Sequence, residues 1–155
     1  MKTTTTISEI TKADLVDLFS TAVYGSPYLK VEYDESVEWN EDDCHEDIIA
    51  NILLHGGSVR VCDYYAEGVA YGDLANNVYD DKSVAYTLTL EDIRKGLESA
   101  INGTFRNEGT PEYQQMVLDF ARKSFNAFWY DEREWDAVTA DYLMQIILFG
   151  EVIYG

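Results

Sequence analysis

Nine carboxylates stand within sixteen residues of this chain, between positions 32 and 47. They are Glu32, Asp34, Glu35, Glu38, Glu41, Asp42, Asp43, Glu46 and Asp47. Carboxylates clustered in this way have four uses: a solvated surface, an imitation of nucleic-acid phosphates, a divalent-metal site, or a carboxylate pair for acid–base catalysis. Each use makes a different demand on spacing and surroundings.

The spacing suits a row of regularly placed negative charges. Residues two apart on a strand lie on one face about 6.6 Å from each other, and residues three or four apart on a helix lie about 5–6 Å apart. Phosphates along one nucleic-acid strand have comparable separations. The row would run through Glu32 and Asp34 on a strand, then Glu38, Glu41 and Asp42. Trp39 lies within it, and aromatic rings of this kind concentrate binding energy at interfaces.

A solvated surface is the competing interpretation. Asp42, Asp43, Glu46 and Asp47 precede or begin a predicted helix, where negative charge complements the helix dipole. A dedicated calcium loop is disfavoured, because the segment 34–47 has no glycine for the sharp turn. A catalytic carboxylate pair needs one acid with a raised pKa and one ionised acid in the same cleft, and no pattern here specifies such a pair. We therefore expect no metal, no cofactor and no catalytic residue, and so a protein that is not an enzyme.

The remaining reactive residues do not form a recognisable site. Cys44 and His45 are adjacent, and adjacent residues on a helix point about 100° apart. No CxxC or HxxxH spacing supports a Cys/His metal site with Cys62 or His55, so buried cysteines and helix-end histidines are expected. The aromatic residues between Phe125 and Trp135 are predicted to be core, with an aromatic-acidic rim at Trp129 and Tyr130 as the alternative.

The charge of the chain is concentrated in two blocks. Among 155 residues, 29 acids and 11 bases give a net charge of -18. Residues 31–81 carry 14 acids and one base, and residues 131–155 carry six acids and one base, so these blocks account for all of it. We expect no direct binding to nucleic acid or to an anionic membrane, because both need clustered Lys and Arg. A basic protein surface is the expected partner.

With 46% hydrophobic residues, the chain is too apolar for a disordered acidic tail. Apolar periodicity, N-capping residues and glycine stops predict five helices. Four run at about 12–24, 45–55, 90–102 and 137–149, and one opens at 110–112 with a buried stripe that continues to Phe128. Strands are expected at 28–33, 59–65, 84–89 and 151–154. Glycines at 25, 56–57 and 150 are predicted to turn from helix to strand through a left-handed conformation. The fold class is therefore α+β: one acidic domain, 1–155, with about five helices packed on a small, mostly antiparallel sheet of three to four short strands.

No secretory signal is visible after Met1, and the apolar stretch from Tyr142 to Phe149 is far shorter than the roughly 20 residues that span a bilayer. Two cysteines are too few to suggest a disulfide framework in a chain of this length. A cytoplasmic protein with reduced thiols is expected.

Three stretches resemble a family of small acidic proteins encoded by bacteriophages and mobile elements of gut-type bacteria. They are Thr21 to Gly25, Leu88 to Gly96, and Thr139 to Asp141 continuing through Gln145 to Gly155. The resemblance covers most of the chain and is most specific at the C-terminal run. It implies no catalytic residues. It does imply a virus or mobile element acting inside the cytoplasm of a bacterial host.

The sequence thus predicts a non-enzymatic DNA mimic, whose carboxylates at 32–47, helped by 131–141, occupy the basic groove of a host nucleic-acid-binding defence enzyme. The anti-CRISPR or anti-restriction role follows from genomic context and not from residues. The alternative is a phage or mobile-element scaffold that forms a homodimer through apolar C-terminal surface, with its charge serving solubility.

Overall fold

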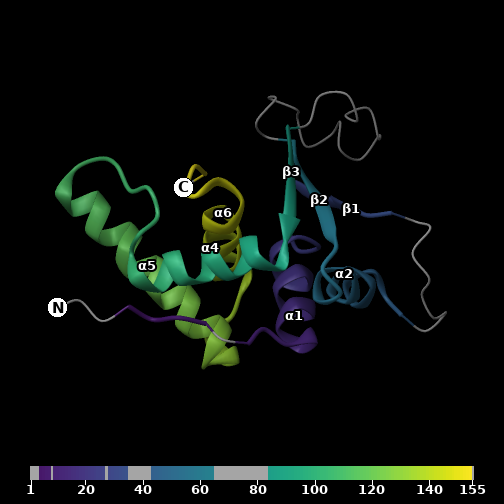
Figure 1. Cartoon of the computed structure of the whole chain (residues 1–155). Coiled ribbons are helices and arrows are strands. Elements are labelled where there is room, and N and C mark those ends of the chain that lie inside the picture. Colours follow the sequence, from purple (N-terminus) through teal and green to yellow (C-terminus); the bar gives the residue numbers. More distant parts are fainter. Residues whose placement is uncertain (1–3, 8, 27, 35–42, 65–83, 155) are drawn as a thin grey trace.

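The computed structural model describes residues 4–7, 9–26, 28–34, 43–64 and 84–154 (Figure 1). Its helices are α1 (Lys12–Ala22), α2 (His45–Leu54), α4 (Leu90–Asn102), α5 (Pro111–Trp129) and α6 (Ala137–Phe149), with a 3₁₀ turn η1 (Glu132–Glu134). Its strands are β1 (Leu29–Glu32), β2 (Ser58–Asp63) and β3 (Val84–Thr89). Of the described residues, 57% are helical and 14% are strand, so the α+β prediction is confirmed.

The three strands form one antiparallel sheet in the order β1-β2-β3. The register places Leu29 opposite Asp63 and Glu32 opposite Arg60, and Ser58 opposite Thr89. The predicted strand at 151–154 is wrong: Glu151 makes only an isolated parallel bridge with Arg106. Beyond it, the side chain of Gln145 bonds the backbone N–H groups of Ile153 and Tyr154, both at 2.8 Å, where a neighbouring strand would otherwise do so.

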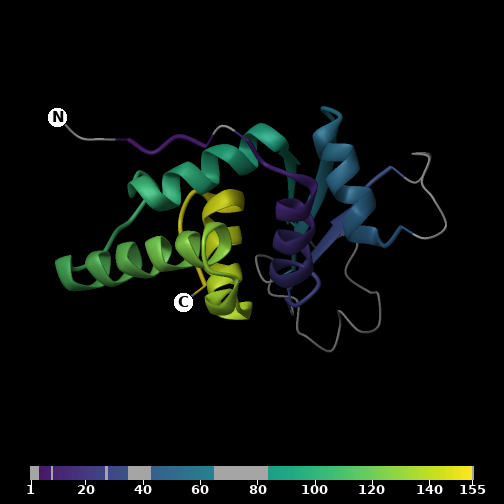
Figure 2. The ribbon, with the colours of Figure 1, turned by 90° about the horizontal axis from the view of Figure 1, so that it is seen from below.

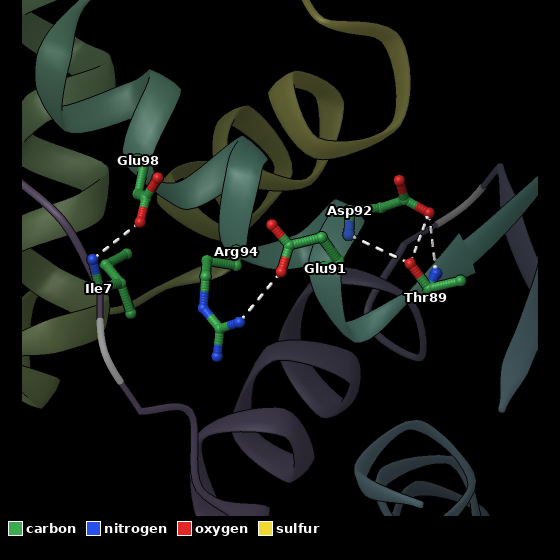
Figure 3. A network of polar contacts seen from close by, with 6 residues as sticks. All are labelled: Ile7, Thr89, Glu91, Asp92, Arg94 and Glu98. Carbon is green, nitrogen blue, oxygen red and sulfur yellow. Dashed lines mark hydrogen bonds and ion pairs between the residues drawn. The ribbon is translucent and has the colours of Figure 1, made fainter. Parts of the chain in front are cut away.

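Side-chain caps define where the helices begin. In α4, Thr89 Oγ1 accepts from the Asp92 backbone N–H (3.2 Å), and the Asp92 carboxylate accepts from the Thr89 backbone N–H (2.9 Å), as Figure 3 shows. Thr11 and Asp14 form the same reciprocal capping box at the start of α1. Such boxes provide acceptors for backbone N–H groups at the start of the helix, which have no carbonyl partner within the helix. The capping residues therefore set these boundaries locally.

The helix ends follow the predicted glycines with one exception. Gly103 and Gly150 adopt left-handed conformations (φ 72° and 71°) after α4 and α6. The left-handed turn predicted at Gly25 is wrong, because the φ of Gly25 is not positive. Glycine fits there for another reason: a Cβ atom would lie 2.7 Å from the carbonyl oxygen of Thr21.

Helices α4, α5 and α6 lie together on one side of the molecule, and α1, α2 and the sheet lie on the other (Figures 1 and 2). Helix α6 is central, and all six of its residues from Leu143 to Leu148 are buried. Gly96 of α4 permits a close crossing with α6, because an added Cβ would lie 2.6 Å from the Cα of Ile147. One hydrophobic core joins residues of both sides.

The N-terminal segment before α1 is bound to α4 (Figures 2 and 3). The carboxylate of Glu98 accepts the backbone N–H of Ile7 at 2.8 Å. Thr5 exchanges two hydrogen bonds of 2.8 Å with the side chain of Asn102. In the described segments, no helix has the length and hydropathy needed to cross a bilayer.

Candidate functional site

The predicted acidic block is only partly within the described residues. Glu35, Glu38, Trp39, Glu41 and Asp42 lie outside them. The structure does place the two ends of the block. Glu32 is the last residue of β1 and Asp34 follows the strand, and Asp43, Glu46 and Asp47 lie around the start of α2.

The strand part of the predicted row is wrong. Strand β1 ends at Glu32, so Asp34 lies beyond it and the two residues do not share a strand face. Across the ladder, Arg60 Nη1 lies 3.1 Å from Glu32 Oε2 and forms an ion pair with it. Glu32 is therefore compensated within the fold, because the register places the only base of residues 31–81 directly opposite it.

The start of α2 assigns its acids unequal roles. The carboxylate of Asp47 accepts from the Cys44 backbone N–H (3.3 Å) and from its thiol (3.0 Å), and Lys12 Nζ lies 3.8 Å away. The bonds from Cys44 hold the pKa of Asp47 below its usual value. Cys44 is exposed here, although a buried cysteine was expected, because it serves as the N-cap residue; Cys62 is buried. Glu46 acts on two neighbours: its hydrogen bond with the Cys44 side chain is the first cause that raises the pKa of Cys44, and its charge helps to raise the pKa of Tyr24.

Helix α1 lies close to both acidic blocks. The pKa of Asp17 is raised, first by partial burial and then by the negative charges of Glu132 in η1 and Asp14 one turn earlier. We define the α1 acidic surface as Asp14, Asp17, Glu46, Asp47 and Glu132. Glu132 of the second block acts on Asp17, and Asp47 of the first block lies 3.8 Å from Lys12 Nζ at the start of α1. Each of the two blocks thus has a member next to α1.

A hollow of about 640 Å³ opens beside this surface, between the end of α1, strand β1 and the start of α2. The rings of Tyr24 and His45 are stacked with centroids 6.3 Å apart, and the Tyr33 hydroxyl is hydrogen-bonded to Nδ1 of His45. Tyr24 is 46% exposed, and burial followed by the charge of Glu46 raises its pKa to about 12. Lys30 also lines the hollow. Exposed aromatic rings beside acids are typical anchors for a basic partner.

The second aromatic segment divides between its two interpretations. Phe125 and Phe128 are buried, and Trp129 stacks on Phe125 with ring centroids 5.9 Å apart, as the core prediction requires. Tyr130 is 72% exposed and is followed by Asp131, so it alone has the exposure that a rim needs.

A buried polar network was missed in the sequence. The Tyr28 hydroxyl donates to Asp141 (2.5 Å), Gln145 Nε2 donates to the other Asp141 oxygen (2.7 Å), and the Tyr154 hydroxyl donates to Asp63 (2.7 Å). Tyr28 and Asp141 are 113 positions apart, and Asp63 and Tyr154 are 91 apart. No local pattern joins residues so far apart. The one available signal was a polar Gln145 in an otherwise apolar helix.

Within the described segments, no three His, Cys, Asp or Glu side chains gather in a way that could hold a metal ion. No protein-family model, curated protein or solved structure matches this chain. The arrangement itself is therefore the basis for a functional proposal: clustered negative charge, with exposed aromatic rings beside it.

Proposed function

We propose that this protein is a non-enzymatic, phosphate-mimicking binding protein of a bacteriophage or mobile element, which occupies the basic nucleic-acid groove of a host defence enzyme of CRISPR or restriction type. The observation that carries the proposal is the gathering of like charges from three segments on the α1 acidic surface. Gathering like charges costs folding free energy, since they repel one another. A partner that supplies positive charge would recover that cost on binding.

Two further features support a partner surface. The rings of Tyr24 and Tyr33 line a hollow beside the acids, where they can provide apolar contact and specificity. Charge alone increases association rate more than it selects a partner, so a specific inhibitor needs such anchors. The motif resemblance supplies the viral and cytoplasmic context, and charge of this sign excludes nucleic acid itself as the ligand.

The mechanism is competition. Carboxylates on the α1 acidic surface take the positions of phosphates against lysine and arginine side chains of the groove, and the nucleic acid is excluded both sterically and electrostatically. Counterions are released from both surfaces when they meet. The affinity should therefore fall by about tenfold or more when salt is raised from a low to a physiological concentration.

The test compares two triple variants with equal charge. The surface variant carries Asp17→Asn, Glu46→Gln and Glu132→Gln, and it leaves Asp14 and Asp47 in place because they cap helices. The control variant carries Asp119→Asn, Glu108→Gln and Glu112→Gln, which are exposed acids in the part of the chain with no net charge. Both variants lose three negative charges, so a difference between them reports position and not net charge.

Partners are first captured from bacterial lysate at low and high salt, and captured nucleases are then assayed for DNA cleavage with each variant. Wild type and the control variant should protect the DNA, and the surface variant should not. Equal protection by both triple variants, or failure of wild type to inhibit any captured or purified restriction or CRISPR nuclease, would overturn the proposal.

Self-association as a scaffold is the second candidate function, and a specific observation favours it. Val138 and Ile153 are apolar residues of the C-terminal region with 59% and 51% of their surface exposed. A dimer formed through them should persist or strengthen at high salt, in contrast to a phosphate mimic. Sedimentation velocity at low and high salt therefore separates the two functions.

A further inference from the structure

A second cavity, of about 350 Å³, lies between the end of α1 and the beginning of α6. Three tyrosines (Tyr28, Tyr142 and Tyr154) and the carboxylate of Asp141 line it, together with small and apolar residues that include Val138. Its volume falls at the small end of the range for ligand pockets, which is about 300–1,000 Å³. The cavity is thus large enough for an extended aliphatic side chain.

The carboxylate in this cavity retains unused acceptor capacity. Asp141 Oδ1 accepts from the Tyr28 hydroxyl and Oδ2 accepts from Gln145. A carboxylate has about four lone-pair positions, so about two remain for a further donor. Among the described residues, no Lys, Arg or His forms an ion pair with Asp141.

The surroundings of Asp141 increase the attraction for a cation. Asp63, which is 1% exposed, accepts the hydrogen bond of the Tyr154 hydroxyl, and its charge acts on both Tyr28 and Tyr154. The rings of these two tyrosines are in edge contact, with centroids 5.1 Å apart. Aromatic rings attract cations through their electron-rich faces, and aromatic cages with a carboxylate are a common way to bind ammonium groups.

We propose that this cavity binds the cationic end of an aliphatic chain, the chemistry that lysine and arginine side chains share. Asp141 accepts hydrogen bonds from the cation, and the tyrosine rings enclose the methylene groups and the charge. The cation site is argued from its own geometry; only the identification of its natural ligand as a basic side chain of the partner rests on the proposed function.

The experiment titrates three small probes of similar length: n-butylammonium, n-butylguanidinium and neutral 1-butanol. Binding is followed by NMR shifts of residues 21–26 and 137–142 at moderate salt, which screens the surface acids. At least one cation should bind about tenfold more tightly than the alcohol, the usual scale of a charge-assisted hydrogen bond. The tighter of the two cations identifies lysine or arginine as the matching side chain.

Two variants test the cavity separately. Asp141→Asn removes the charge, so the preference for the cation over the alcohol should disappear. Glu134→Gln is the matched control, because it removes one exposed charge outside the cavity and should leave the titration unchanged. Val138→Trp narrows the mouth at an exposed position without touching the hydrogen-bond network, and it should weaken all three probes.

Equal affinity for cation and alcohol would mean an apolar cavity only and would overturn the inference. Cation binding that survives both Asp141→Asn and Val138→Trp would place the cation on the surface and overturn it as well. If Asp141→Asn does not fold, Val138→Trp decides alone. The proposed function fails on a different result, the equal behaviour of the two triple variants, so the two failures are distinguishable.

Discussion

The carboxylates of α4 and those of the α1 acidic surface are used in opposite ways. On α4, Asp92 caps the helix, Glu98 holds the N-terminal segment at Ile7, and Glu91 pairs with Arg94 at 3.0 Å (Figure 3). On α1, the pKa of Asp17 is raised by partial burial and then by the charges of two nearby acids. The α4 acids stabilise the fold. On the α1 acidic surface, Asp14 and Asp47 also do so as helix caps, whereas Asp17 is kept in place against the repulsion of its neighbours.

This difference separates structural acids from acids that await a partner. Within the folded chain, Asp63 and Asp141 are structural acids, because each carboxylate accepts a hydrogen bond from a tyrosine hydroxyl. Total charge does not distinguish the two kinds, since both contribute equally to the value of -18. The hydrogen-bond partners of the acids distinguish the two kinds.

Alkaline pH should produce the largest effect, because it ionises tyrosine hydroxyls that donate to carboxylates. The resulting phenolates repel the same carboxylates. Burial, then the bond to a carboxylate, raises the pKa of Tyr28 and Tyr154 above the usual 10, and Tyr24 reaches about 12. The folded state thus favours the neutral phenols, so their contribution to stability is complete below pH 10 and is lost as the pH rises through the folded values. Urea unfolding followed by circular dichroism should show a steep loss of stability above pH 10. A flat profile up to pH 12 would contradict this.

Loss of the α4 cap should have the next largest effect. Thr89→Ala removes one half of the capping box with Asp92 and should lower the free energy of unfolding by about 1 kcal/mol. Thr104→Ala is the control, because Thr104 is exposed and its backbone N–H bond to Ser99 is retained in alanine. Denaturant titrations of the two variants should differ by that amount. Equal stability would mean that the Thr89 side chain does not hold the start of the helix.

Salt should have a smaller effect of the opposite sign. Screening weakens repulsion among exposed like charges, so the melting temperature should rise by about 2 °C between low and moderate salt. Differential scanning calorimetry at several sodium chloride concentrations measures this rise. An unchanged or falling melting temperature would indicate that the acids of the chain are already compensated within the fold.

Removal of a single repelled charge should have the smallest effect. The raised pKa of Asp17 means that its ionised form is unfavourable in the folded state at neutral pH. Asp17→Asn should therefore stabilise the protein, by about 0.3 kcal/mol for an exposed like-charge contact. Asp119→Asn, which instead replaces the charged acceptor of Gln115 with a neutral amide oxygen, should not stabilise. A destabilised Asp17→Asn variant would move Asp17 into the class of structural acids.

Most of the fold was predictable because its signals are local. Thr11, Thr89 and Asp136 each cap the helix that begins at the next residue, and Gly103 ends α4 as a glycine stop. These effects act within one turn of helix, so a short stretch of sequence contains both partners. The prediction of a fourth strand was wrong for the opposite reason, a long-range contact. The side chain of Gln145 in α6 accepts hydrogen bonds from backbone N–H groups that a neighbouring strand would have paired.

The candidate site was less predictable. The sequence identified Glu46 and Asp47 as acids near a helix start, but it could not show that the charge of Glu46 acts on Tyr24, 22 positions earlier, or that Asp47 lies near Lys12. It also treated Glu32 as part of a charged row, although the sheet register pairs it with Arg60. Whether a carboxylate is compensated depends on partners tens of residues away.

The sequence by itself determined the helices, the sign of the charge and its division into two blocks, because composition, caps and periodicity are properties of neighbouring residues. Only the tertiary structure decided which acids are bonded and which repel. It placed Glu132 beside Asp17 and joined Asp141 to Tyr28. Electrostatic interactions depend on distance in space, and only the packing of α1, α6 and η1 sets those distances.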